Sequence, residues 1–287
     1  QPLEISQYGV GDGLPTYFTK DIIQDSLGYV YIASDEGLSV FNGLKFNNYT
    51  KSLQSKYVKH LYKDSSGAIF VVTDGGISKA TWKEDELQFS QLITASQQLR
   101  DSTLNYPKEI YQDKEGFYWV SEPNALSQLS PEGEIKERYL FPEQERSTSY
   151  FKSYTTFELN KTLFTISEKG GIYKFNRQEQ AFYRQAIDEF YKEGARIENI
   201  FQTDYNTIFI AATNGLFTFA YKEGQSTLQQ LVADKHVTAI TTYQNGKYLF
   251  STDDSDLYSI NKQLDPASIN LIMKTPLHGI NNFHRGA

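Results

Sequence analysis

The chain repeats one pattern of short hydrophobic stretches separated by polar turns that contain glycine. Residues 25–41 read DSLGYVYIASDEGLSVF, residues 64–80 read DSSGAIFVVTDGGISKA, and residues 113–129 read DKEGFYWVSEPNALSQL. Each copy holds two apolar runs of four to six residues, and polar residues alternate with apolar ones around them. Such runs, bounded by Gly, Asp and Ser, predict short β-strands joined by tight turns.

One bulky side chain follows the glycine turn in each copy, and it allows the copies to be counted. The intervals between these positions are 39, 49, 45, 45 and 40 residues. A period near 44 residues with several strands per unit is typical of a β-propeller built from four-stranded blades. A helical solenoid of similar period is disfavoured, because apolar residues do not recur at i, i+3, i+4 and i+7. The six positions are Tyr31, Phe70, Trp119, Phe164, Phe209 and Leu249.

The expected fold class is therefore an all-β propeller with six full blades and the flanking strands of a truncated seventh. The blades are expected at about 17–50, 57–93, 106–141, 151–187, 196–232 and 236–274. In the first blade we expect strands at about 18–25, 29–34, 38–41 and 45–50. Gly28 and Gly37 lie in turns that need a positive φ, and Asn42-Gly43 is a hairpin signal.

Two further strands are expected outside the six blades. Residues 5–10 resemble the last strand of a blade, and residues 279–284 resemble the first. We interpret residues 1–287 as a single propeller domain, a fragment of a longer chain whose incomplete seventh blade holds both strands. A closed six-bladed ring with two stray ends is the alternative.

Composition excludes several classes of function. The chain has no cysteine, so disulfides, thiolate metal sites and a Cys nucleophile are excluded. Its net charge of −7 without a basic tract argues against a nucleic-acid partner. Its longest apolar runs are far shorter than the roughly 20 residues that span a membrane, so we expect no membrane insertion by this segment.

The recurring polar residues have a structural interpretation and a catalytic one. Acidic side chains recur in one turn of successive blades, where Asp caps local backbone. An active site such as a glycosidase pair needs different residues in different roles, so we favour the structural interpretation. No histidine pair has the spacing of zinc ligands, and we expect no metal, cofactor or catalytic residue. The acidic residues are Asp35, Asp74, Glu168 and Asp253, and the histidines are His60, His236, His278 and His284.

One set of residues is a candidate ligand-binding site. These residues precede the first inward position of the innermost strand of their blades, where the mouth of the central channel is expected. Aromatic faces and a guanidinium there would suit a sugar ring or a carboxylated sugar. Packing between blades is the alternative role. The candidates are Phe18, Tyr57, Tyr106, Arg196 and His236.

The motifs resemble two-component regulator propeller repeats. The residues that carry the resemblance are Gly11–Pro15, Gln24–Gly28, Tyr31–Ser34 and Gly37–Phe41, with a second good match over Asp64–Ser78. The resemblance implies the N-terminal part of the periplasmic sensor region of a hybrid two-component histidine kinase. It also implies a second propeller and further domains in the same receptor, and many such sensors respond to oligosaccharides.

Three hypotheses for function follow. The first is a non-enzymatic extracytoplasmic sensor module whose ligand is carbohydrate-derived. The second is a protein-interaction or dimerisation scaffold, in which a homodimer would hold the signalling geometry. The third and least favoured is a propeller glycosidase or lyase, which would need unlike polar residues converging on one pocket at the channel mouth.

Overall fold

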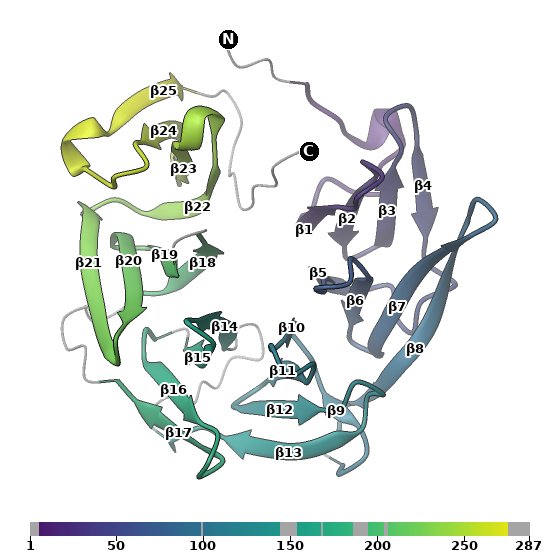
Figure 1. Cartoon of the computed structure of the whole chain (residues 1–287). Helices are drawn as coiled ribbons and strands as arrows, with labels where there is room; N and C mark the ends of the chain where they lie inside the picture. The colour runs from purple at the N-terminus through teal and green to yellow at the C-terminus, as the bar shows by residue number, and fades with distance from the viewer. Residues whose placement is uncertain are drawn as a thin grey trace.

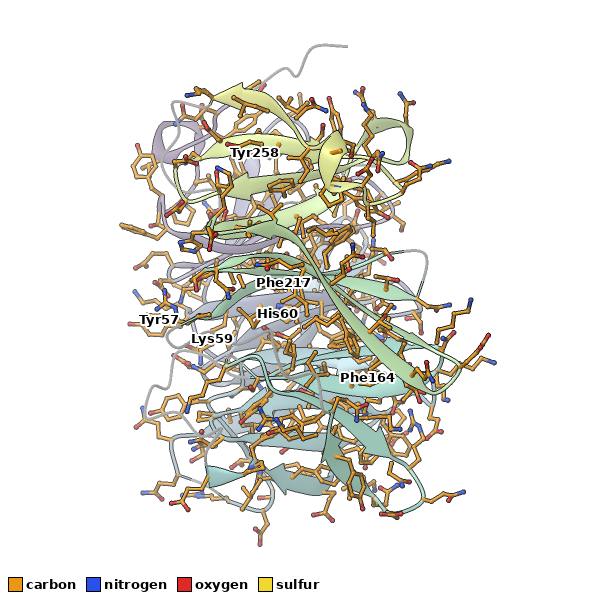
Figure 2. The ribbon with its side chains drawn as sticks, turned by 90° about the vertical axis from the view of Figure 1, so that its left-hand side faces the viewer. Tyr57, Lys59, His60, Phe164, Phe217 and Tyr258 are labelled. Atoms are coloured by element: carbon orange, nitrogen blue, oxygen red, sulfur yellow. The ribbon has the colours of Figure 1, made fainter. Side chains whose placement is uncertain are left out.

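Six sheets stand around a central axis in the computed structural model. The structure describes residues 6–98, 100–143, 154–167, 169–185, 195–203 and 206–274. Within each sheet the strands follow one another in chain order, so every blade is a meander. Figure 1 looks along the axis, and Figure 2 shows the same blades edge-on. The predicted all-β propeller is confirmed.

The blades follow the repeats of the sequence. Blade one holds β1 (Thr19–Gln24), β2 (Val30–Ser34), β3 (Gly37–Phe41) and β4 (Phe46–Tyr49). Blade two holds β5 (Val58–Lys63), β6 (Ile69–Thr73), β7 (Gly76–Lys83) and β8 (Glu86–Ser96). Blade three holds β10 (Glu109–Gln112), β11 (Tyr118–Glu122), β12 (Ala125–Leu129) and β13 (Ile135–Leu140). Blade four holds β14 (Thr155–Leu159), β15 (Thr162–Ile166), β16 (Ile172–Asn176) and β17 (Ala181–Arg184). Blade five holds β18 (Ile197–Gln202), β19 (Thr207–Ala212), β20 (Gly215–Lys222) and β21 (Gln225–Ala233), and blade six holds β22 (Val237–Thr242), β23 (Tyr248–Thr252), β24 (Asp256–Ile260) and β25 (Asn270–Lys274).

Glycines make the tight turns between these strands. Gly28, Gly37 and Gly43 have φ of 90°, 123° and 91°, as the sequence predicts. Gly76, which opens β7, has φ of 140°, and a Cβ there would lie 2.2 Å from the carbonyl oxygen of Ile93. Only glycine combines that backbone conformation with so close an approach of the neighbouring strand.

Hydrophobic clusters lie between successive blades, and the bulky side chains of the repeats help to form them. Tyr31 packs with Val58 and Leu61 of blade two, and the equivalent Trp119 packs with Leu163 of blade four. The next residue along each strand points to the preceding blade, because side chains alternate across a sheet. Five clusters of this kind join blades one to six in order, and among the described residues no cluster joins blade six to blade one.

The aspartate of the repeated D-x-x-G turn supports the following strand. In blade one, Asp25 Oδ1 accepts hydrogen bonds from the backbone N–H groups of Leu27 and Tyr29, both at 2.9 Å. Its other oxygen accepts from the Tyr31 hydroxyl at 3.0 Å. Asp64 and Asp113 bind the backbone of their own turns in the same way.

Blade three departs from the repeat at the turn Glu122-Pro123-Asn124. Glu122 takes the place of a small hydroxyl residue, is buried, and pairs with Arg138 at 3.1 Å. It also accepts a hydrogen bond from the backbone N–H of Asn105. That contact secures β9 (Leu104–Asn105), a short strand that pairs in parallel with the end of β8 and makes blade two five-stranded.

Of the two strands expected for a seventh blade, the one at residues 5–10 is not formed over the described residues 6–10. Residues 6–9 have no regular structure, and Val10 begins a 3-10 turn, η1 (Val10–Asp12). Tyr8 instead packs on Phe41 and Phe46, with ring centroids 5.1 and 5.9 Å away. Residues 279–284 lie outside the described part of the chain.

Candidate functional site

The innermost strands of blades one to three place three unlike polar groups at the same position of their sheets. Register shifts in β1 and β5 lie just before Asp21 and His60, and such bulges re-aim the side chains beside them. Asp21, His60 and Glu109 lie opposite Ala33, Val72 and Ser121 of the next strand in each blade. Blades four to six carry Thr155, Asn199 and Ala239 at the equivalent position.

His60 and Asp21 form an ion pair between blades two and one. Nδ1 of His60 lies 2.9 Å from Oδ2 of Asp21, and these side chains are only 26% and 11% exposed. The same carboxylate accepts the backbone N–H of Leu61 at 2.8 Å. Burial opposes a charged imidazole, but the hydrogen bond and charge of Asp21, together with Glu109, outweigh it and raise the pKa of His60.

Glu109 extends this group toward blade four. Burial raises the pKa of its carboxyl, while the charge of His60 and a hydrogen bond with Thr155 act in the opposite direction. Its backbone N–H donates to Ser121 Oγ at 3.2 Å. An acid and a base with shifted pKa values thus lie close together on two neighbouring inner strands.

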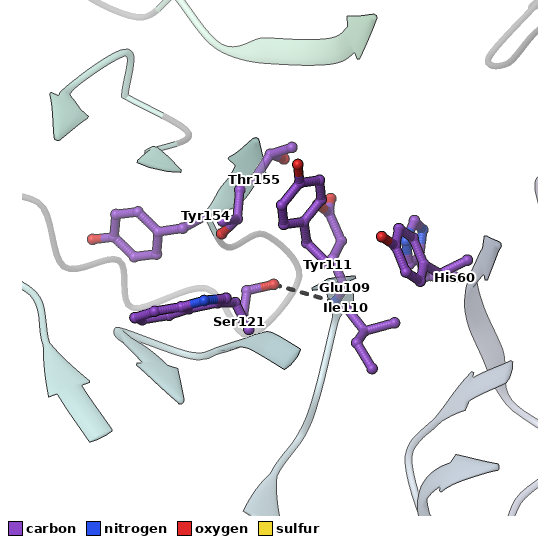
Figure 3. A pocket seen from close by; sticks show the side chains of 10 residues that line it. His60, Glu109, Ile110, Tyr111, Ser121, Tyr154 and Thr155 are labelled. Atoms are coloured by element: carbon purple, nitrogen blue, oxygen red, sulfur yellow. Dashed lines mark hydrogen bonds between the residues drawn. The ribbon is translucent and has the colours of Figure 1, made fainter. Parts of the chain in front are cut away.

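A pocket of about 140 Å³ opens beside these groups, at the inner edges of blades two to four. Figure 3 shows Tyr111, Tyr154 and Thr155 around it with His60 and Glu109. Aromatic faces and hydroxyl groups share its wall. This combination orients a small ligand by stacking and by hydrogen bonds.

Lysines occupy the positions just before these polar groups. Lys20 and Lys59 stand at the bulges of β1 and β5, and Lys108 precedes β10. Figure 2 shows Lys59 with Tyr57 toward one face of the propeller and His60 farther inside. Each of these lysines directly precedes one member of the His60 group in the chain.

The acidic residues of the recurring turn partly differ from the expectation. Asp35 forms an ion pair with Lys20 within blade one, and Asp74 forms one with Lys59 within blade two. The turn backbone is bound instead by hydroxyl groups, since Ser34 Oγ accepts the N–H of Glu36 at 3.2 Å. Asp35 and Asp74 do not cap the turn backbone, so the expected capping role is wrong for these two positions. Glu168 lies outside the described residues.

The contacts of the five candidate residues fall into two groups. Phe18 and Tyr57 are 78% and 45% exposed just before β1 and β5, and Tyr106 lies near Lys59, whose Nζ is 5.6 Å from its ring centroid. Across the ring, Arg196 and His236 both pair with Glu198, at 3.7 and 3.4 Å. The structure thus divides the set into an aromatic group beside blades one to three and an ionic group on blades five and six.

Sequence analysis missed the His60 group. Asp21, His60 and Glu109 show no motif in the sequence, because each belongs to a different repeat and the three residue types differ. An alignment of the repeats on their bulky positions would have placed them in one column. The bulges in β1 and β5 that re-aim Asp21 and His60 cannot be recognised in the sequence.

The described part of the chain holds neither a metal site nor a membrane helix. No group of three or more His, Asp or Glu side chains there is arranged to hold a metal ion. None of its helical segments is long and apolar enough to cross a membrane.

Comparison with solved structures supports the fold assignment. The extracellular domains of two putative hybrid two component systems from B. thetaiotaomicron superpose with TM-scores of 0.72 and 0.71, at 17% and 15% identity. They match 96% and 92% of this chain, but the matched part is only 38% and 37% of their own length. The chain therefore spans less than two fifths of these structures.

A second kind of propeller is also similar. Virginiamycin B lyase from Staphylococcus aureus superposes with a TM-score of 0.65 at 13% identity, over 94% of this chain and 89% of the lyase. No protein-family model and no curated protein matches the chain. At these identities the likeness establishes the propeller fold, and function has to be argued from the site.

Proposed function

We propose that this chain is a sensing propeller in the extracytoplasmic, periplasmic region of a two-component receptor, and that it is not itself an enzyme. The observation that carries this proposal is the fold likeness to two extracellular domains of hybrid two component systems, over nearly the whole of this chain. Ligand binding would favour one packing of this propeller against other parts of the receptor, and that shift in population would be the signal.

The pocket supports a small ligand derived from carbohydrate. Its volume of about 140 Å³ is close to that of cavities that hold a single six-membered ring. Tyr111 and Tyr154 line it with aromatic rings, and Thr155 lies on the same wall. A sugar ring presents both an apolar face and hydroxyl groups, so it complements such a wall.

A thermal-shift screen with oligosaccharides tests this proposal. A ligand at 100 times its dissociation constant adds about 2.7 kcal/mol to the free energy of unfolding. We expect Tyr111→Leu to remove the shift, and Tyr183→Phe, at an exposed position on β17, to retain it. A shift unchanged by Tyr111→Leu would place the ligand elsewhere. If no saccharide shifts the thermal unfolding, the interaction-scaffold hypothesis is favoured.

A lyase is the second candidate, because unlike polar groups do converge on one pocket. His60, held by Asp21 and beside Glu109, has the elements of general acid–base chemistry. Any saccharide that binds should therefore be incubated with the protein and analysed by mass spectrometry. Recovery of the intact ligand supports the sensor. Cleavage that His60→Asn abolishes would establish the enzyme instead.

We further propose that a seventh blade stands between blades six and one. Figure 1 shows no described strand in that sector. Ile32 occupies the position that faces the preceding blade, equivalent to the fully buried Val71, yet it belongs to no cluster. On the other side, Leu249 holds the position that faces the following blade, and it too belongs to none of the five clusters.

A matched pair of substitutions tests whether this face is covered. Val71→Arg should destabilise the protein by about 3 kcal/mol or more, since it buries an unpaired charge between blades one and two. If a seventh blade covers Ile32, Ile32→Arg should cost a similar amount. A cost below about 0.5 kcal/mol, typical of an open surface, would contradict the proposal.

A further inference from the structure

Lys108 differs from the other lysines at the starts of the innermost strands of blades one to three. Lys20, Lys56 and Lys59 each pair with a carboxylate, namely Asp35, Glu36 and Asp74. No ion pair is found for Lys108 within the described ranges. The charged groups that act on its ammonium group include Lys59, whose Nζ lies 3.4 Å from the carbonyl oxygen of the adjacent Pro107.

The surroundings of Lys108 disfavour its positive charge. Burial and the charges of Lys59 and Lys20 lower its pKa to about 8, and Asp74 compensates only in part. Asp74 is already paired with Lys59, whose Nζ also lies 3.4 Å from the carbonyl oxygen of Pro107. A half-buried cation without a counter-ion costs stability, and such costs concentrate at functional sites.

This positive site contrasts with the rest of the molecule. The chain as a whole carries a net charge of −7. At the starts of the innermost strands of blades one to three, lysines instead recur, and exposed aromatic residues lie close to them in the chain. Tyr17 and Phe18 are 73% and 78% exposed, and Lys56 Nζ lies 5.4 Å from the centroid of the Tyr57 ring.

We infer that Lys108 and Lys59 bind an acidic group of the ligand, so that the carbohydrate that the propeller senses carries a carboxylate. This inference rests on the proposed sensing function and assigns it a ligand class. The acid would supply the counter-ion that Lys108 lacks, and charge-assisted hydrogen bonds are the stronger ones. Aromatic rings at the rim would contact the sugar faces, as stacking platforms do.

Binding of acidic oligosaccharides and of their neutral counterparts tests the inference. Fragments of polygalacturonate, alginate and hyaluronan, each with a carboxyl-reduced version, are titrated by calorimetry at fixed ionic strength. We expect at least one acidic fragment to bind, and its carboxyl-reduced version to bind at least about 10-fold more weakly. Lys108→Gln should cause a similar loss. Lys222→Gln, at the exposed end of β20, should leave the affinity unchanged.

A pH series gives a second readout that a purely structural lysine would not produce. An acid bound to Lys108 raises its pKa, so binding takes up a proton where the free protein is deprotonated. Affinity should then fall by up to about 10-fold per pH unit above pH 8. Lys108→Arg keeps its charge at these pH values and should show no such fall. Lys59, Lys20 and Asp74 are the charged groups near Lys108, and they are unchanged in both variants.

The outcomes distinguish failure of the acidic-ligand inference from failure of the proposed sensing function. Equal binding of acidic and carboxyl-reduced fragments, or full binding to Lys108→Gln, overturns the acidic ligand and leaves the sensing function standing. Failure of all acidic fragments to bind, while a neutral saccharide binds, does the same. Failure of every saccharide to bind overturns the inference together with the carbohydrate-sensing function on which it rests.

Discussion

The indole Nε1 of Trp119 donates a hydrogen bond to Oδ2 of Asp113 across 2.9 Å. Oδ1 of the same carboxylate accepts the backbone N–H groups of Glu115 and Phe117, at 2.9 and 3.1 Å. The guanidinium of Arg177, from blade four, lies 3.3 Å from Oδ2. One buried aspartate thus connects a turn, the central aromatic ring of its blade and the next blade. The repeated motif is therefore a structural unit of the propeller.

Asp113→Ala should lower the free energy of unfolding by about 3 kcal/mol. It removes two backbone caps and the partner of a buried indole, and it leaves Arg177 with less compensation. Denaturant unfolding measures the loss. Asp101→Ala, at an exposed position in a loop, is the control and should change stability by less than about 0.5 kcal/mol. A loss of the same small size for Asp113→Ala would mean that the motif does not stabilise the blade.

Gly76→Ala should destabilise the protein more than Gly43→Ala. Both glycines have a positive φ, but a Cβ at Gly76 would collide with the carbonyl of Ile93, whereas nothing lies within 4 Å of a Cβ at Gly43. We expect about 1 kcal/mol for Gly43→Ala, from its backbone conformation alone, and about 3 kcal/mol or more for Gly76→Ala. Thermal unfolding of the two variants compares them. Equal losses would show that β7 and β8 shift without cost.

Stability should fall as pH rises through the titration of the His60 group. The folded pKa of His60 is raised above its ordinary value, so its contribution is complete below about pH 6.5 and is lost above the folded pKa. Glu109, whose pKa is also raised, acts in the same direction at lower pH, from about 4.5 upward. Unfolding free energies between pH 5 and 8.5 should show this decline.

The Asp21→Asn variant isolates the His60 contribution. Without the Asp21 charge, the pKa of His60 should drop, because burial then dominates. NMR titration of the imidazole follows that pKa directly. An unchanged pKa in Asp21→Asn would show that the ion pair does not control the charge of His60.

Lys108→Met should stabilise the protein at pH 7, in contrast to most substitutions of half-buried residues. The folded pKa of Lys108 is about 8, below its ordinary value of 10.5, so the unfolded chain binds the proton more tightly. Stability should therefore rise with pH between about 8 and 10.5, and the substitution should remove that rise. We expect a gain of about 1 kcal/mol at pH 7, reduced by solvent screening. Destabilisation by Lys108→Met would show that the charge is well compensated in the fold.

Local patterns in the sequence determined the blades of this protein. Alternation with a period of two fixes which side chains lie on each face of a strand, so Tyr31 and Trp119 are predicted between blades. Gly28 and Gly37 are predicted in turns because few other residues adopt a positive φ. Each of these properties depends on residues close together in the chain, and the resemblance to known repeats follows from the same positions.

Only the tertiary structure decided which groups meet at the centre. Asp21, His60 and Glu109 belong to three blades, and two register shifts re-aim the first two side chains. The missing counter-ion of Lys108 is likewise a property of its position between neighbouring blades. Charge, burial and pKa at these positions depend on contacts between distant segments of the chain. The repeat therefore determines the scaffold, whereas the packing of one blade against the next determines the candidate site.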